Sequence, residues 1–315
     1  LMAISCTLSE MSSNAPLSVG IVGASGFTGA ELMRLIAGHP SLSLVVATGD
    51  TQAGTKVSSL YPSLASDFGK MVYSSYDPSD FVGLDAVFLG LPHMASQPVV
   101  AELFKEVGCL IDLGSDFRLK DPDLYPRWYG AEHTMPELID EFVYGLPELY
   151  RSDLEGARGI AVPGCYPTTA ALALAPFVLA DKIETTGVIV DAASGVSGAG
   201  RSLQPATAFA AVDENFNAYG LLTHRHTPEM EQVSGCEILF TPHLAPMVRG
   251  ILATCYARPK DPSFSTDQAL EVLAQRYADE PFVIVDEASP STKACLLYTS
   301  PSPRDGLLSR MPSSA

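Results

Sequence analysis

The stretch LSVGIVGASGFTGAELMRLIAGHP, residues 17–40, limits the possible folds of this chain more than any other. An apolar run typical of a buried strand leads into three glycines at three-residue spacing, and a helical pattern follows over 31–37. A glycine turn between strand and helix offers backbone N–H groups and the positive end of a helix dipole to phosphate. It predicts a dinucleotide site, although a turn with glycines used only for packing would look similar. The predicted site comprises Gly23, Ala24, Ser25, Gly26, Thr28 and Gly29.

The end of the next predicted strand, LSLVVATG at 42–49, bears on the choice of nucleotide. An acidic residue at this point typically binds the ribose 2′-hydroxyl of NAD, whereas a basic residue accommodates the 2′-phosphate of NADP. No acidic residue stands directly at the strand end. Asp50 lies two residues beyond Thr48, and Lys56 follows. The pattern favours NADP and leaves NAD open through Asp50.

Strands and helices alternate through the first half of the chain. DAVFLGLP (85–92) and CLIDLGSDFRL (109–119) have the pattern of buried strands, and a helical segment lies between them at 97–108. This alternation predicts an α/β domain with a Rossmann-like, doubly wound parallel sheet. We assign residues 15–164 to this NADP-binding domain.

The pattern changes after residue 165. We expect an apolar helix over 168–180, a strand with a Gly/Ser loop over 185–201, and two long strands within 236–259 that turn near Pro246 and pair antiparallel. An amphipathic helix at 265–279 and a strand at 281–287 complete the segment. These elements predict an α+β catalytic and dimerisation domain with a mixed sheet over 165–294. Its long strands suit a sheet-to-sheet homo-oligomer, a dimer or a tetramer.

Composition excludes several classes of protein. The 315 residues carry a formal net charge of −17, which disfavours nucleic-acid binding, and no uninterrupted apolar run has the length of a membrane span. The six cysteines show neither a C-x-x-C pair nor zinc-ligand spacing, so we expect reduced thiols, a cytoplasmic location and no metal. We expect a small-molecule substrate.

A candidate nucleophile lies in PGCYPTTA, residues 163–170. Pro167 suits the first turn of a helix, which places Cys165 just before a helix N-terminus. There the helix dipole and unpaired N–H groups stabilise a thiolate, and Gly164 leaves room for a substrate. A nucleophilic cysteine and an inert buried thiol fit this fragment equally well.

A nucleophilic thiol needs a proton partner, and THRHTPEM (223–230) contains the one close pair of histidines in the sequence. His224 and His226 are both candidates, and a solvent-exposed loop that caps a helix beginning near Pro228 is the alternative. Arginines after strands or glycine loops are candidate clamps for phosphate or carboxylate, although for any single one of them the sequence favours a surface ion pair. They are Arg118, Arg201 and Arg249.

Together these segments resemble the N-acetyl-γ-glutamyl-phosphate reductase family within the semialdehyde dehydrogenase superfamily. The matching stretches run in family order from about residue 17 to 293: GIVGASGFTGAEL, FLGLPHMAS, IDLGSDFRL, YGLPEL, VPGCYPTTA, SGVSGAGR, HRHTPEM and FTPHLAPMVRGILAT. The PGCYPT and HRHTPE elements are specific to the family, whereas the glycine turn is shared by many enzymes.

The resemblance implies NADPH-dependent reduction of N-acetyl-glutamyl 5-phosphate to the 5-semialdehyde and phosphate, a step of arginine biosynthesis. It implies Cys165 as the nucleophile that forms a thioester, and His224 as acid/base with His226 in reserve. Arg118 matches the phosphate-binding position, and we expect Arg249 to be a second substrate-binding residue. On the cofactor side it adds Pro92, Ser197 and Gly198.

Other interpretations remain open from the sequence. The same chemistry fits aspartyl phosphate or an aminoadipyl phosphate, and a non-catalytic nucleotide-binding protein could keep the fold. Residues 1–14 precede the family-like region, with Met11 a plausible start and no basic signal-peptide region. The Ser/Pro-rich residues 295–315 lack any helical or strand period. We expect them to be a non-native tail in place of the family's closing segment, and the sequence leaves open whether the chain with this tail is active.

Overall fold

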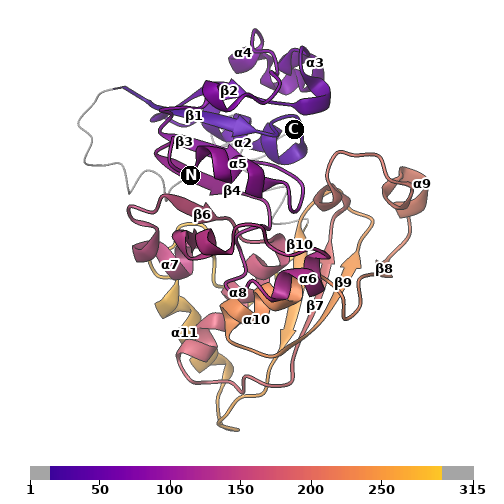
Figure 1. Cartoon of the computed structure of the whole chain (residues 1–315). Coiled ribbons are helices and arrows are strands. Elements are labelled where there is room, and N and C mark those ends of the chain that lie inside the picture. Colours follow the sequence, from indigo (N-terminus) through magenta and orange to yellow (C-terminus); the bar gives the residue numbers. More distant parts are fainter. Residues whose placement is uncertain (1–14, 293–315) are drawn as a thin grey trace. The chain divides into compact units, whose positions relative to one another are not determined.

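The computed structural model describes residues 15–292, which form two units that divide between Pro163 and Gly164 (Figure 1). The sequence-based assignments of 1–14 and 295–315 lie outside the described residues. No helix among the described residues has the length and hydrophobicity needed to cross a membrane.

The first unit is built on a parallel sheet of six strands in the order β2-β1-β3-β4-β6-β5. From β1 the chain first adds β2 on one side and then returns to add β3 on the other side, which is the arrangement of a doubly wound fold. The strands are β1 (Leu17–Val22), β2 (Leu42–Ala47), β3 (Ala86–Leu89), β4 (Cys109–Asp112), β5 (Phe142–Tyr144) and β6 (Gly159–Ala161). The last two are three residues long, too short for the sequence to have marked them. The predicted Rossmann-like class is confirmed.

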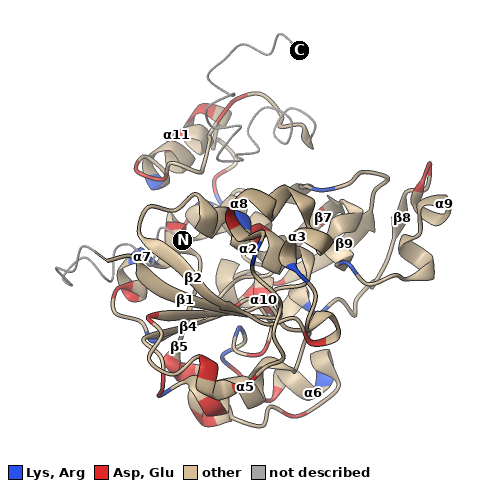
Figure 2. Cartoon of the chain, turned by 90° about the horizontal axis from the view of Figure 1, so that it is seen from above, with Lys and Arg blue, Asp and Glu red and all other residues tan. Residues whose placement is uncertain are grey.

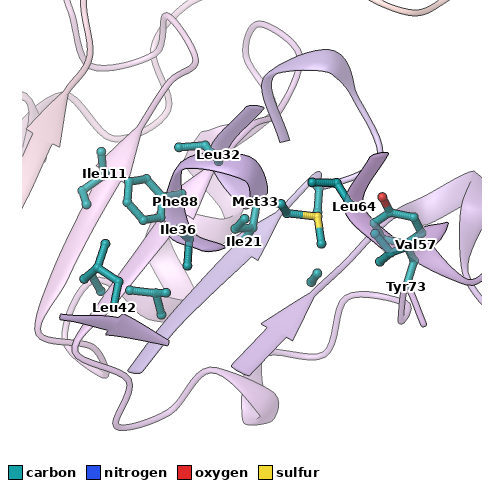
Figure 3. Close-up of a cluster of buried hydrophobic side chains, with 14 of the residues drawn as sticks. Ile21, Leu32, Met33, Ile36, Leu42, Val57, Leu64, Tyr73, Phe88 and Ile111 are labelled. Atoms are coloured by element: carbon teal, nitrogen blue, oxygen red, sulfur yellow. The ribbon is translucent and has the colours of Figure 1, made fainter. Parts of the chain in front are cut away.

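Helices connect these strands, and two buried clusters form the core of the unit. Figure 3 shows one cluster, in which Met33 and Ile36 of a helix meet Ile21 and Phe88 of the sheet. The other cluster contains Leu89, Leu103 and Phe117. The helices are α2 (Phe27–Ala37), α3 (Val57–Leu60), α4 (Ala65–Phe68), α5 (Ser96–Leu103), α6 (Leu124–Tyr129) and α7 (Pro147–Leu154).

The second unit contains a mixed sheet of four strands in the order β10-β7-β9-β8. The strands are β7 (Val188–Ser194), β8 (Asn217–Ala218), β9 (Ile238–Leu244) and β10 (Ile251–Tyr256). Helices α8 (Cys165–Leu179) and α10 (His226–Ser234) contact each other and this sheet. The apolar residues between them include Tyr166, Leu174, Val190 and Phe240. Helices α9 (Phe209–Val212) and α11 (Thr266–Arg276) complete the unit.

Two sequence-based expectations for this unit are wrong. The strands β9 and β10 do not pair with each other, because β7 lies between them, parallel to β9 and antiparallel to β10. No strand forms at 281–287 in the described structure, where Phe282 and Ile284 are exposed. A segment with alternating apolar residues forms a β-strand only where another strand pairs with it, and the alternation does not indicate which strand that is. The helix expected at 168–180 begins earlier, at Cys165.

Charge is distributed as the composition implies. Figure 2 shows acidic positions recurring along the ribbon, including α5 and α11, with few basic ones.

Candidate active site

The glycine turn of the first unit forms where the sequence predicts it. Gly23 has φ +82°, and a Cβ at this position would lie 2.5 Å from the Gly90 carbonyl oxygen. A Cβ at Gly29 would lie 2.3 Å from the Ala24 carbonyl oxygen, whereas the nearest atom to one at Gly26 would be the Gly23 carbonyl oxygen at 3.9 Å. Two glycines therefore allow the backbones to pack closely, and Gly26, the N-cap of α2, leaves open space before the helix.

The turn is tied to the end of β2. Ala24 is fully buried and its N–H donates to the Thr48 carbonyl, while the Gly23 N–H donates to Thr48 Oγ1. The Tyr61 hydroxyl donates to the Ser25 carbonyl. Ala24 thus has a packing role, and Ser25, half-buried, and Thr28, exposed, remain the residues with accessible hydroxyls. The open N-terminus of an 11-residue helix fits the pyrophosphate of a dinucleotide.

The structure at the end of β2 does not decide between NADP and NAD. Asp50 is exposed and begins the short 3-10 turn Asp50–Gln52. Lys56 is also exposed, just before α3. Both side chains are therefore open to solvent.

Arg118 lies in the loop after β4. Its side chain is 6% exposed, and Nη2 donates to the Leu113 carbonyl. The nearby Asp112 is fully buried at the end of β4, where its Oδ1 accepts from the Ser96 hydroxyl and the Gly114 N–H. Burial is the main cause that raises the pKa of Asp112 to about 6, and Arg118 counteracts it.

In the second unit Cys165 is the first residue of the 15-residue helix α8, and its side chain is exposed. A thiol at this position lies at the positive end of the helix dipole, which favours the thiolate. Three other cysteines of the described chain differ: burial raises the pKa of Cys109 to about 12, of Cys255 to about 11, and also that of Cys236. The structure therefore distinguishes an accessible cysteine from inert ones, which the sequence could not do.

Both histidines of the H-x-H pair lie beside this helix terminus. Their rings are 4.9 Å apart between centroids, and each packs edge-on against Tyr166, the residue after the nucleophile candidate. A Cβ at Gly164 would lie 2.6 Å from His226 Nε2, so the glycine is required by the approach of that ring. The structure thus brings Cys165, His224 and His226 to one place.

The two histidines differ in their hydrogen bonding. The backbone N–H of His226 donates to His224 Nδ1 at 3.1 Å, so a neutral His224 carries its proton on Nε2. Burial, with a smaller effect from Arg225, lowers the pKa of His224 to about 4. His224 is consequently a neutral imidazole near pH 7 that presents an N–H donor.

Sequence reasoning gave no role to two neighbours that the fold supplies. Glu229 is fully buried on α10, and its Oε1 accepts from the Gly164 N–H at 2.8 Å. The Tyr219 hydroxyl lies 3.0 Å from the Tyr166 hydroxyl. Burial mainly raises the pKa of Tyr219, and Cys165 adds to the effect. For Glu229 the sequence did carry a signal: it follows His226 by three residues, which places both on one face of a helix.

Two further loops of this unit carry predicted residues. Ser197 and Gly198 lie in the 3-10 turn Val196–Ala199 after β7, and Arg249 is exposed in the loop between β9 and β10. The Gly195 N–H donates to the Gly250 carbonyl, and the Ser197 N–H to the Val248 carbonyl. The structure therefore joins these loops directly. Arg201 is half-buried beyond the same turn.

Comparison with known proteins decides the family. The semialdehyde dehydrogenase NAD-binding domain model matches residues 18–157, and the semialdehyde dehydrogenase dimerisation domain model matches 165–298. The N-acetyl-γ-glutamyl-phosphate reductase of Symbiobacterium thermophilum is 46% identical over 88% of this chain and 82% of its own length. That of Desulforamulus reducens is 43% identical with the same coverage. This chain belongs to the N-acetyl-γ-glutamyl-phosphate reductase family.

Solved structures agree on the fold. The chain is similar to aspartate semialdehyde dehydrogenase II of Vibrio cholerae complexed with ASA, with a TM-score of 0.60 and 14% identity over 84% of this chain and 80% of that one. It is also similar to aspartate semialdehyde dehydrogenase with NADP from Candida albicans, with a TM-score of 0.56 and 13% identity over 82% and 76%. At these identities the likeness shows the architecture alone.

Proposed function

We propose that this chain reduces N-acetyl-glutamyl 5-phosphate to N-acetyl-glutamate 5-semialdehyde and phosphate with NADPH, as in arginine biosynthesis. Family membership supports the reaction. The observation that carries the mechanism is the exposed Cys165 at the N-terminus of α8, beside two histidines.

The chemistry divides one substitution into two steps. The Cys165 thiolate attacks the acyl carbonyl, phosphate leaves with the bonding electrons, and a thioester remains. NADPH, when bound, would supply a hydride to the thioester carbon, and a histidine would donate a proton to the oxygen to give a thiohemiacetal. The hydroxyl then returns its proton to the histidine as the carbon–sulfur bond breaks, which releases the aldehyde and restores the Cys165 thiolate.

The hydrogen bonding of the histidines supports distinct roles. His224 holds a proton on Nε2, so it acts as the donor toward the developing carbonyl oxygen. His226 lies with Nε2 against Gly164, next to the nucleophile, and is the candidate to accept the thiol proton. Glu229 accepts a hydrogen bond from the Gly164 N–H and so positions the backbone just before Cys165. A positioned acid or base contributes about 10²–10⁴-fold in rate.

Each of the two units contributes residues that we expect to bind the cofactor or the substrate. The first α2 N–H groups, with Ser25 and Thr28, bind the pyrophosphate, and Pro92 contacts the nucleotide. Ser197 and Gly198 contact its nicotinamide half, while Arg118 and Arg249 bind the acyl phosphate. Lys56 supports NADP, and NAD is the alternative that Asp50 favours.

The oligomer involves the second unit. The family model for residues 165–298 is a dimerisation domain. The face of its sheet opposite α8 and α10 exposes large apolar side chains: Ile189, Leu239, Leu252 and Tyr256. We propose that this face packs against the same face of a second copy in a homodimer.

The decisive experiment follows phosphate-dependent NADP reduction with N-acetylglutamate semialdehyde, aspartate semialdehyde and an aminoadipate semialdehyde derivative. We expect turnover with the first alone, loss of at least about 10³-fold for Cys165→Ser, and no loss for Cys255→Ser. Iodoacetamide at pH 6 should alkylate Cys165 first, and substrate should protect it. Faster turnover with another semialdehyde would contradict the proposed substrate. Cofactor binding with an unreactive Cys165 would support the non-catalytic alternative.

A further inference from the structure

In the first unit, the loops that follow β3 and β4 are joined by side chains rather than by strand pairing. The first loop runs from Gly90 to Ala95 and contains Pro92, and the second runs from Leu113 to Leu119 and contains Arg118. Because β3 and β4 are adjacent and parallel, both loops leave the sheet at its carboxyl edge. That edge is where doubly wound sheets bind their ligands.

Asp116 makes the main connection between these loops. It is fully buried, its Oδ1 accepts from the Met94 N–H at 2.7 Å, and its Oδ2 accepts from the Ser96 N–H at 2.9 Å. His93 Nδ1 and the Ser115 hydroxyl add a contact of 2.8 Å. One carboxylate oxygen of Asp116 therefore binds the backbone of the β3 loop, and the other binds the first residue of α5, which follows that loop.

Asp116 is itself held from the other side. Its carbonyl accepts from the Tyr125 hydroxyl at 2.6 Å and from His133 Nε2 at 2.7 Å. The Met135 N–H donates to His133 Nδ1, which fixes the neutral tautomer with its proton on Nε2. The main chain at Asp116 is thus held by two side chains, and its carboxylate reaches from there to the residues that follow β3.

The β3 loop also contacts the glycine turn. The Gly90 N–H donates to the Val22 carbonyl, and Gly90 is the residue against which Gly23 packs. Met94 has φ +63°, a left-handed backbone that a residue with a side chain adopts at a cost of about 1–3 kcal/mol unless its surroundings hold it. The bond from Met94 to Asp116 supplies such a hold.

We propose that Asp116 is a positioning residue that couples nucleotide binding at the glycine turn and Pro92 to phosphate binding at Arg118. This inference rests on the proposed function, which assigns the two ligands to these loops. Each ligand stabilises the same joined arrangement of the loops, so each increases the affinity for the other by the same factor.

The test measures the NADPH dissociation constant of the full chain by fluorescence titration, with and without saturating inorganic phosphate. We expect phosphate to tighten NADPH binding by about fivefold or more in the parent, the lower end of typical coupling between sites. Asp116→Asn keeps one acceptor oxygen and turns an amide group toward the second N–H. In this variant both ligands should still bind, and the coupling factor should fall below about twofold.

The control is Asp77→Asn. Asp77 also accepts from a backbone N–H, that of Ser79, but it caps the separate turn Pro78–Asp80. This variant should keep the parental coupling factor. If Asp116→Asn fails to fold, Ser115→Ala, which removes the contact to His93 and the 3.4 Å hydrogen bond to Asp116 Oδ1, should lower the coupling factor.

The outcomes separate the two levels of proposal. Absence of NADPH binding in the parent contradicts the proposed function and the coupling together. Binding of both ligands without coupling, or parental coupling in a folded Asp116→Asn or in Ser115→Ala, overturns the role of Asp116 alone. A loss of thermal stability with unchanged coupling identifies Asp116 as a purely structural cap of α5.

Discussion

At the residue scale, the chain keeps an unfavourable group in its core. Asp112 is fully buried, and its Oδ2 has no hydrogen-bond partner. Burial raises its pKa from the ordinary value of 3.8 to about 6, so the folded state holds this proton more tightly than the unfolded state. Stability contributed by the protonated form is therefore lost as pH rises from about 4 to about 6.

Asp112→Asn should remove most of this pH dependence. The amide oxygen can still accept from Ser96 and Gly114, and the charge is gone. At pH 7.5 we expect the variant to be more stable than the parent by up to roughly 3 kcal/mol, the free energy that corresponds to the rise in pKa. Urea unfolding at pH 4.5 and 7.5 measures both values. A variant that is less stable at pH 7.5 and keeps the parental pH slope contradicts the prediction.

Gly164 stands at a position that has no room for a side chain. Its backbone lies in the extended region at φ −66° and ψ 156°, which alanine adopts freely. Any effect of Gly164→Ala therefore comes from the clash with the His226 ring, whose three nearest atoms are within 2.9 Å of the added Cβ.

We expect Gly164→Ala to fold and to lose about 10–100-fold in kcat, because the ring must move away from the nucleophile. Steady-state rates and the rate of Cys165 alkylation test this together. Gly156→Ala is the control: Gly156 has φ +74° and open space around it, so that variant should lose stability and keep kcat. Parental kcat in Gly164→Ala would show that the His226 ring can shift without consequence.

At the scale of elements, α11 shows a helix specified by its own sequence. The Ser265 hydroxyl accepts from the Gln268 N–H, and the Gln268 side chain accepts from the Ser265 N–H, which forms a complete capping box. Its residues are largely exposed, so tertiary contacts do little to compensate for a lost cap.

Ser265→Ala should destabilise the helix by about 1 kcal/mol, because the Gln268 N–H loses the hydroxyl that accepts its hydrogen bond. Thermal unfolding followed by circular dichroism measures the change. Ser265→Asp keeps an acceptor at the cap and should restore most of the stability. Equal stability in the alanine and aspartate variants would mean that the capping box is not a stabilising contact.

At the scale of the whole molecule, the proposed dimer explains an apolar surface on an acidic protein. The chain has a net charge of −17, yet the outward face of the second sheet carries Leu239 at 50% exposure and Tyr256 at 54%. Apolar side chains that recur on one sheet face mark an interaction surface.

Leu252→Glu places a charge on this face and should shift the dimer to monomer, because a two-fold interface carries each substitution twice. Sedimentation or light scattering at several concentrations measures the change. Val45→Glu, at an exposed position of β2 in the first unit, should leave the dimer intact. Dimers in both variants would place the interface elsewhere.

Sequence alone determined the local features of this protein. The glycine turn, the alternation that gives a parallel sheet, and the helix α11 follow from spacing and capping, which act over a few residues. The H-x-H pair and PGCYPT also stood out, because each combines reactive side chains with turn-forming residues in a short span.

Tertiary structure decided what depends on distant partners. The insertion of β7 between β9 and β10, the absence of a strand at 281–287, and the burial of Asp116 required the whole fold. The same holds for the packing of His226 against Gly164, residues 62 positions apart in the chain. Strand partners and burial arise from contacts between segments far apart in sequence, and no local pattern encodes which segment will supply them.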